Sequence, residues 1–172
     1  MGETLRSKAA GMKTVYLSLG SNLGDRATLL SEALRMIESP RLHVRRVSPI
    51  YETEPQDVKT QPWFLNLVAE VETDLFPRQL LSRLKGFERR LGRRRRVSKG
   101  PREIDIDILL FGDAVIDTQE LTVPHPRMPE RRFVLQPLAD LAPELRHPLL
   151  KKTVREMLAT TMQQAVRRHS QP

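Results

Sequence analysis

Two aspartates, Asp105 and Asp107, carry the clearest chemical signal in the chain. They lie in the run K-G-P-R-E-I-D-I-D-I-L-L, residues 99–110. Side chains of a β-strand alternate between its faces, so both carboxylates are expected on one face. The apolar residues are expected to share the other face: Ile104, Ile106, Ile108 and Leu110. Two acids this close repel each other unless a cation lies between them, and Mg²⁺, often bound together with substrate phosphates, suits such oxygen ligands.

A basic segment comes just before the aspartates. From Arg89 to Arg102 there are eight basic residues and no acidic one, whereas the rest of the chain balances 21 basic against 21 acidic residues. Such a run is typical of a solvated loop or of a site for a polyanion, and nucleic acid and a triphosphate both qualify. For the aspartates themselves, the alternative is an edge strand whose acids simply face water.

Composition narrows the class of protein. A chain of 172 residues is long enough for one domain with a buried core, which we assign to residues 13–172 after a disordered tail at 1–12. There is no apolar run of membrane-spanning length, and the first residues lack the apolar stretch of a signal peptide. There is no cysteine, which excludes disulfides and thiolate metal sites. We therefore expect a cytoplasmic protein without a membrane partner.

Hydrophobic periodicity predicts the elements that must position the aspartates. Alternation predicts strands over residues 14–19, over 42–51 with an interruption at Pro49, and over 64–73. Helical spacing predicts one helix ending at Ser39-Pro40 and another from Pro77, with its buried stripe at Leu80, Leu84, Phe87 and Leu91. With the aspartate strand, the order is βαββαβ. This is the ferredoxin-like α+β sandwich, with both helices on one face of a largely antiparallel sheet.

The open face of that sheet is expected to hold the site, because Phe64 and Asn66 should lie there with the two aspartates. Beyond Phe111 the chain is rich in proline, which predicts extra short strands, turns and one short helix before Pro143. Apolar residues at helical spacing predict a C-terminal helix over residues 153–168.

Several common catalytic patterns are missing. Gly20 to Asp25 is not a P-loop, no G-x-G-x-x-G occurs, and the four histidines lack the spacing of zinc ligands. No serine lies in a nucleophile elbow. The remaining carboxylate pair, arginines and aromatic–amide pair fit metal-assisted phosphoryl transfer, in which positioning and charge neutralisation supply most of the catalysis.

The sequence resembles one family over roughly residues 14–149. The segment K-G-P-R-E-I-D-I-D-I-L is similar to the signature of 6-hydroxymethyl-7,8-dihydropterin pyrophosphokinases, enzymes of folate biosynthesis. Further similar segments occur in the expected order: V-Y-L-S-L-G-S-N-L-G-D, Y-E-T-E-P, Q-P-W-F-L-N, L-T-V-P-H-P and L-A-P-E-L. The resemblance implies a ferredoxin-like fold and transfer of the β,γ-pyrophosphoryl group of ATP to the pterin hydroxymethyl oxygen, with release of AMP.

The resemblance also implies roles for particular residues. Two Mg²⁺ ions would be held by Asp105 and Asp107, and Asp107 is a candidate acceptor for the hydroxyl proton. Pterin would be bound by Gly20, Thr53, Phe64, Asn66 and Phe133. Phosphates would be clamped by Arg93 and Arg102, with Arg95 a further loop candidate. The remaining ATP-binding candidates are Lys85, Glu88, Thr122, His125 and Arg131. We expect a monomer whose partners are ATP and the pterin.

Structural alternatives exist for several of these residues. Phe64, Asn66 and Phe133 could be ordinary packing residues, His125 a turn histidine, and Lys85 and Glu88 part of a solvated helix face. A rival function is RNA binding through a ferredoxin-like sheet and the basic loop. That alternative lacks the aromatic-rich RNA-binding motif, because Asp105 and Asp107 stand where stacking aromatics should be. A non-catalytic scaffold is a third possibility.

Overall fold

A β-sheet forms the centre of the structure, a computed structural model that describes residues 11–92 and 103–169. The first half of the chain contains β1 (Lys13–Ser21), α1 (Arg26–Ile37), β2 (Leu42–Val47), β3 (Tyr51–Thr53), β4 (Phe64–Thr73) and α2 (Pro77–Arg90). The second half contains β5 (Asp105–Phe111), β6 (Ile116–Asp117), β7 (Thr122–Val123), a 3₁₀ turn (Met128–Glu130), α3 (Arg132–Leu141), α4 (Val154–Ala159) and β8 (Val166–Arg168).

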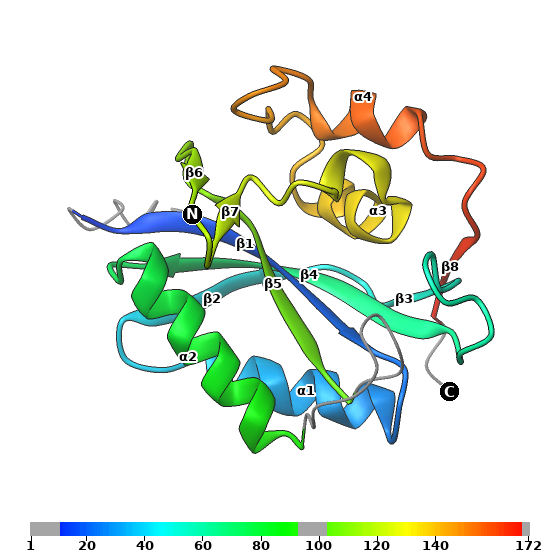
Figure 1. Ribbon diagram of the computed structural model, residues 1–172, viewed down its shortest axis with the longest axis horizontal. Coiled ribbons are helices and arrows are strands. Elements are labelled where there is room, and N and C mark those ends of the chain that lie inside the picture. The colour runs from blue at the N-terminus through cyan, green and yellow to red at the C-terminus, as the bar shows by residue number, and fades with distance from the viewer. Residues whose placement is uncertain (1–10, 93–102, 170–172) are drawn as a thin grey trace, which may run out of the picture.

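The sheet has the strand order of the expected fold. Its order is β5-β1-β4-β3-β8, with β2 also paired to β4, and all pairs are antiparallel. The chain breaks between β2 and β3 around Pro49, as the sequence predicted, because proline cannot donate to a ladder. Both halves of the broken strand nevertheless lie beside β4 (Figure 1). The ferredoxin-like prediction is confirmed.

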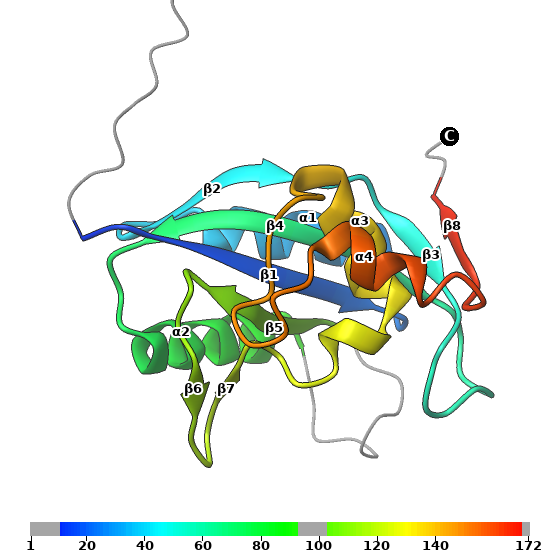
Figure 2. The same ribbon diagram turned by 90° about the horizontal axis from the view of Figure 1, so that it is seen from above.

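Helices cover both faces of the sheet. α1 and α2 pack on one face and α3 and α4 on the other, as Figures 1 and 2 show. The first core joins the sheet to α1 and α2 and includes Leu19, Leu67 and Leu84. The second joins it to α3 and α4 and includes Val68 and Leu135. The face that the sequence left open is therefore covered in part, by α3 and α4.

Local signals begin and end the first two helices as expected. Asp25 caps α1 by accepting a hydrogen bond from the backbone N–H of Thr28 at 3.2 Å. Pro77 occupies the first turn of α2, where a missing N–H costs nothing. The predicted stripe of α2 is buried, with Leu80 and Leu84 fully so.

The structure corrects two sequence predictions. The helix predicted over residues 153–168 is wrong: α4 ends at Ala159, and residues 166–168 form strand β8 beside β3. Leu110 does not share a face with the isoleucines, because a β-bulge leaves Leu109 without a counterpart between Tyr16 and Leu17 of β1.

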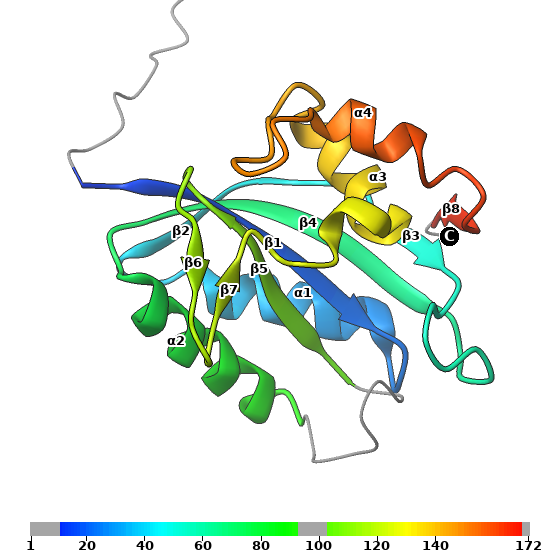
Figure 3. The same cartoon turned by 45° about the horizontal axis from the view of Figure 1, so that its top comes forward.

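One further prediction is confirmed and another stays untested. The short helix expected before Pro143 is α3, and the short strands expected after Phe111 are β6 and β7, which form a hairpin (Figure 3). The tail predicted at 1–12 falls almost wholly outside the described residues. None of the described helices has the length and apolarity needed to cross a membrane.

Candidate functional site

The register of three neighbouring strands builds one row of functional side chains. In β1, Gly20 lies opposite Asp105 of β5 on one side and opposite Asn66 of β4 on the other. Two residues away, Ser18 lies opposite Asp107 and Val68 in the same way. Since neighbouring strands are about 4.8 Å apart, the carboxylates and the Asn66 amide lie about two strand spacings, roughly 10 Å, apart on one face.

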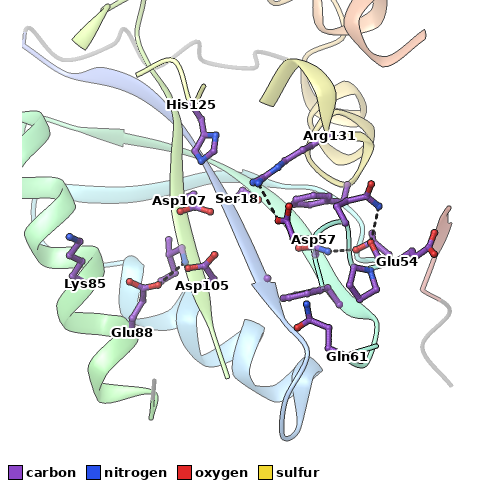
Figure 4. A pocket seen from close by; sticks show the side chains of 18 of the residues that line it. Ser18, Glu54, Asp57, Gln61, Lys85, Glu88, Asp105, Asp107, His125 and Arg131 are labelled. Carbon is purple, nitrogen blue, oxygen red and sulfur yellow. Dashed lines mark hydrogen bonds and ion pairs between the residues drawn. The ribbon is translucent and has the colours of Figure 1, made fainter. Parts of the chain in front are cut away.

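A cavity of about 400 Å³ lies over this row. It collects most of the described residues that the sequence singled out: Gly20, Thr53, Phe64, Asn66, Lys85, Glu88, Asp105, Asp107, His125, Arg131 and Phe133. Figure 4 shows α2 contributing Lys85 and Glu88 from one side, with His125 and Arg131 opposite. The structure does not bring Thr122 to the cavity, because this residue is exposed on β7. Arg93, Arg95 and Arg102 lie outside the described residues.

One end of the cavity is held by buried amide and hydroxyl groups. The Asn66 amide donates a hydrogen bond of 2.5 Å to the hydroxyl of Thr53, and both side chains are buried. Directly after β1, the Asn22 amide donates a hydrogen bond of 2.8 Å to the side-chain oxygen of Gln61. The rings of Phe64 and Phe133 also line the cavity. A flat, polar-edged ring would find stacking surfaces and hydrogen-bonding groups together here.

The other end is strongly acidic. Burial, together with the neighbouring carboxylates of Asp105 and Glu88, raises the pKa of Asp107 to about 8. Glu88 is not on a solvated helix face: it is buried, and its carboxylate accepts a hydrogen bond of 3.1 Å from the backbone N–H of Ile106. α2 is thereby joined to the aspartate strand next to the two acids.

The aspartate pair fits a magnesium ion better than it fits a metal site built wholly from protein. Within the described parts of the chain, no group of three or more His, Cys, Asp or Glu side chains is arranged to hold a metal. Mg²⁺ usually takes one or two carboxylates and completes its shell with water and substrate phosphates. A cation beside Asp105 and Asp107 would also relieve their mutual repulsion, which adds to burial in raising the pKa of Asp107.

His125 and Arg131 provide hydrogen-bond donors beside the acids. Burial, with the charge of Arg131, lowers the pKa of His125 to about 4, so its ring is neutral at pH 7. Its Nδ1 accepts a hydrogen bond from the backbone N–H of Arg127 at 3.2 Å, which leaves the proton on Nε2. Arg131 lies 5.4 Å from the centre of the Phe133 ring and 3.8 Å from the Asp57 carboxylate. Both donors could contact phosphate oxygens in the cavity.

Sequence reasoning missed several residues that line the cavity: Ser18, Glu54, Pro55, Gln56, Asp57, Gln61, Leu81 and Ile106. Ser18 could have been found, since it alternates with Gly20 along β1 and must share its face. Asp57 could not, because only the fold brings its loop to Arg127, at 3.1 Å, and to Arg131.

Comparisons with known proteins point to one family. The sequence model of the 7,8-dihydro-6-hydroxymethylpterin-pyrophosphokinase (HPPK) family matches residues 16–143. A 2-amino-4-hydroxy-6-hydroxymethyldihydropteridine pyrophosphokinase of Aquifex aeolicus is 43% identical over 145 residues, which cover 84% of this chain and 90% of that protein. The Bacillus subtilis protein of the same name is 47% identical over 131 residues, covering 76% and 78%.

Larger proteins also contain a similar part. The folic acid synthesis protein fol1 of Schizosaccharomyces pombe is 43% identical over 159 residues, and this chain spans 92% of its own length but only 22% of that protein. Among solved structures, Plasmodium falciparum HPPK-DHPS with pterin and p-hydroxybenzoate has a TM-score of 0.69 at 20% identity, covering 87% of this chain and 42% of that one. The structural likeness supports the fold.

Proposed function

The chain belongs to the 7,8-dihydro-6-hydroxymethylpterin-pyrophosphokinase family, and from this premise we propose that it makes the pterin diphosphate used in folate synthesis. In the proposed reaction the hydroxymethyl oxygen of 6-hydroxymethyl-7,8-dihydropterin attacks the β-phosphorus of ATP. The new bond joins that oxygen to the β-phosphorus, the bond from the β-phosphorus to the oxygen that bridges it to the α-phosphorus breaks, and AMP leaves. The hydroxyl proton is lost in the same step.

One observation carries the proposal. Asp105 and Asp107 share one face and one cavity with the buried Asn66–Thr53 pair, across a single intervening strand. The strand register thus brings a group able to bind a cation and phosphates to within about two strand spacings of a site for a flat heterocycle. Pyrophosphoryl transfer to a pterin needs both in one cavity, so that the two substrates react as if within one molecule.

We assign the pterin to the amide end of the cavity. Phe64 and Phe133 would stack on its ring, which contributes about 0.5–1.5 kcal/mol beyond the burial of area. Asn66 and Thr53 would hydrogen-bond its amide edge. Gly20 leaves room for the ring, because a side chain there would occupy the space beside the Asn66 amide.

We assign the triphosphate to the acidic end, where Asp105 and Asp107 would hold two magnesium ions. When bound, Mg²⁺ would neutralise phosphate charge and orient the β-phosphorus. His125, through its Nε2 proton, and Arg131 would donate hydrogen bonds to phosphate oxygens, with Lys85 at the rim. We propose Asp107 as the acceptor of the hydroxyl proton, since burial and the neighbouring carboxylates raise its pKa and make its carboxylate a stronger base. The roles expected for Arg93, Arg95 and Arg102 remain predictions from the sequence.

The test uses purified protein, Mg-ATP and 6-hydroxymethyl-7,8-dihydropterin, with AMP as the readout. We expect AMP only when the pterin is present, and a loss of at least about a hundredfold in Asp105→Ala and Asp107→Ala, as for removal of a transition-state charge stabiliser. Asp117→Ala, an exposed aspartate on the β6–β7 hairpin, is the matched control and should keep wild-type activity. AMP formation that does not depend on the pterin, or that is unchanged by both cavity substitutions, would refute the proposal.

The RNA-binding alternative has a separate readout. The two acids on the sheet face would repel a phosphate backbone, so we expect no salt-dependent RNA binding in the absence of Mg²⁺. No comparison reported above favours that alternative.

A further inference from the structure

Strand β8 lies beyond the part of the chain that the family model matches, which ends at residue 143. It adds to the sheet edge at β3, the strand that ends in Thr53 (Figures 1 and 3). We propose that β8 positions the pterin end of the cavity, and that Arg167 is the positioning residue through which it acts. This inference rests on the proposed assignment of the pterin to Thr53, Phe64 and Asn66.

Arg167 joins two segments that are separate in the sequence. Its Nη2 lies 2.7 Å from the Glu52 carboxylate, and its guanidinium lies 5.0 Å from the centre of the Trp63 ring. The ion pair lowers the pKa of Glu52, with the Arg167 hydrogen bond as the largest cause. Glu52 is 20% exposed and Arg167 is 68% exposed, so the contact is shielded from water on the Glu52 side alone.

Both partners of Arg167 are next to residues of the cavity. Glu52 precedes Thr53, and Trp63 precedes Phe64; Thr53 and Phe64 are register partners in the β3–β4 pair. Because neighbouring residues of a strand point to opposite faces, Arg167 holds Glu52 on the face of β3 opposite to the one that carries Thr53. Arg167 also contacts Trp63, which directly precedes β4. It acts on Thr53 and Phe64 through these neighbours and need not touch the substrate.

Backbone contacts extend this support along the edge. The N–H of Glu54 donates to the carbonyl of Ala165 at 3.2 Å, and the N–H of His169 donates to the carbonyl of Ile50 at 2.8 Å. Arg26, the first residue of α1, donates a hydrogen bond of 2.8 Å to the carbonyl of Trp63. The loop that follows Thr53 therefore begins from a fixed edge, and the remaining freedom of the Glu52 and Trp63 side chains is restrained by Arg167.

The test compares Arg167→Gln with Arg155→Gln in the full chain. Arg155 is a close control, because it also lies in the C-terminal part, is equally exposed at 68%, and forms an ion pair of the same 2.7 Å length with Glu144. Neither Arg155 nor Glu144 lines the cavity. Dissociation constants are measured for 6-hydroxymethyl-7,8-dihydropterin and for α,β-methylene-ATP, in which the bond that the enzyme cleaves is blocked. Trp63 is the only tryptophan of the chain, so its emission reports directly on the Arg167 contact.

We expect Arg167→Gln to shift the Trp63 emission to longer wavelength and to weaken pterin binding about threefold to tenfold, the range of a partly shielded ion pair plus a cation–π contact. Binding of α,β-methylene-ATP should change less than twofold, and Arg155→Gln should change nothing. Arg167→Lys, which keeps the charge, should recover part of the pterin affinity.

Two results would overturn the inference, and they differ in what else they affect. A shifted Trp63 emission with unchanged pterin binding would mean that the contact exists but positions nothing, and would leave the proposed function intact. Weakened binding of the ATP analogue with unchanged pterin binding would mean that this end of the cavity takes the nucleotide, and would overturn the proposed pterin assignment as well.

Discussion

Replacing Gly20 by alanine tests the geometry of the site with a single added methyl group. A Cβ built on Gly20 would lie 2.5 Å from Oδ1 of Asn66, where an ordinary van der Waals contact is 3.4–4 Å. The next atoms, Cγ of Asn66 and Cδ1 of Phe64, are each 3.6 Å away and need no adjustment. Since both Gly20 and Asn66 lie in paired strands, the backbones cannot separate easily, and the Asn66 amide must move.

The cost of that movement follows from the hydrogen bond it breaks. Asn66 and Thr53 are buried, and their bond is 2.5 Å long. Leaving such a buried group unsatisfied costs about 1–3 kcal/mol, which lowers the melting temperature of a domain of this size by about 2–12 °C. A displaced amide also cannot meet the pterin edge. The same range, applied to binding, weakens the pterin about 5-fold to 150-fold, since each 1.4 kcal/mol is tenfold.

The assay combines thermal unfolding with dissociation constants for the pterin and for α,β-methylene-ATP. Gly86→Ala is the control: its Cβ would lie 3.8 Å from the nearest atom, within α2, where alanine should stabilise by about 0.5–1 kcal/mol. Adding Asn66→Ala to Gly20→Ala should remove the clash, so the double variant should be about as stable as Asn66→Ala alone. Wild-type stability and pterin affinity in Gly20→Ala would refute the argument.

Three further predictions address the supports of the site. Leu84→Ala removes a fully buried side chain of α2 and should lower the free energy of unfolding by about 2–5 kcal/mol, measured by urea denaturation. Glu88→Ala should lower the free energy of unfolding by about 1–3 kcal/mol, because the backbone N–H of Ile106 loses its acceptor. Glu88→Gln keeps an acceptor, so its free energy of unfolding should stay near that of the wild type. Equal losses in the two variants would contradict this. Burial lowers the pKa of His147, whose Nδ1 accepts two backbone hydrogen bonds, so the unfolded chain binds more protons at this residue than the folded chain does. The free energy of unfolding should therefore fall as the pH drops below about 6.5, and it should fall less steeply in His147→Gln. Parallel pH profiles of the two proteins would contradict this.

The local physics of the chain determined most of the site. Side chains of a strand alternate, so Asp105 and Asp107 had to share a face whatever the rest of the fold did. The same reasoning placed Phe64 and Asn66 together, and the 3.6-residue period identified the buried stripe of α2. These features depend on neighbours within one element, which is why the residues alone predict them.

Long-range pairing decided the rest. The spacing of residues 153–168 suits a helix, but pairing with β3 made β8 instead, since edge pairing depends on a partner more than 100 residues away. Leu110 lies on the face opposite to the predicted one because of a β-bulge in the pairing with β1, and no local sequence pattern predicts that bulge. The ion pairs of Asp57 with Arg127 and of Glu52 with Arg167 likewise exist only once the sheet has assembled. Residue types and their alternation identify the groups that could do the chemistry. What holds those groups follows from the assembled fold, because a register between distant strands is set by packing and not by any one segment.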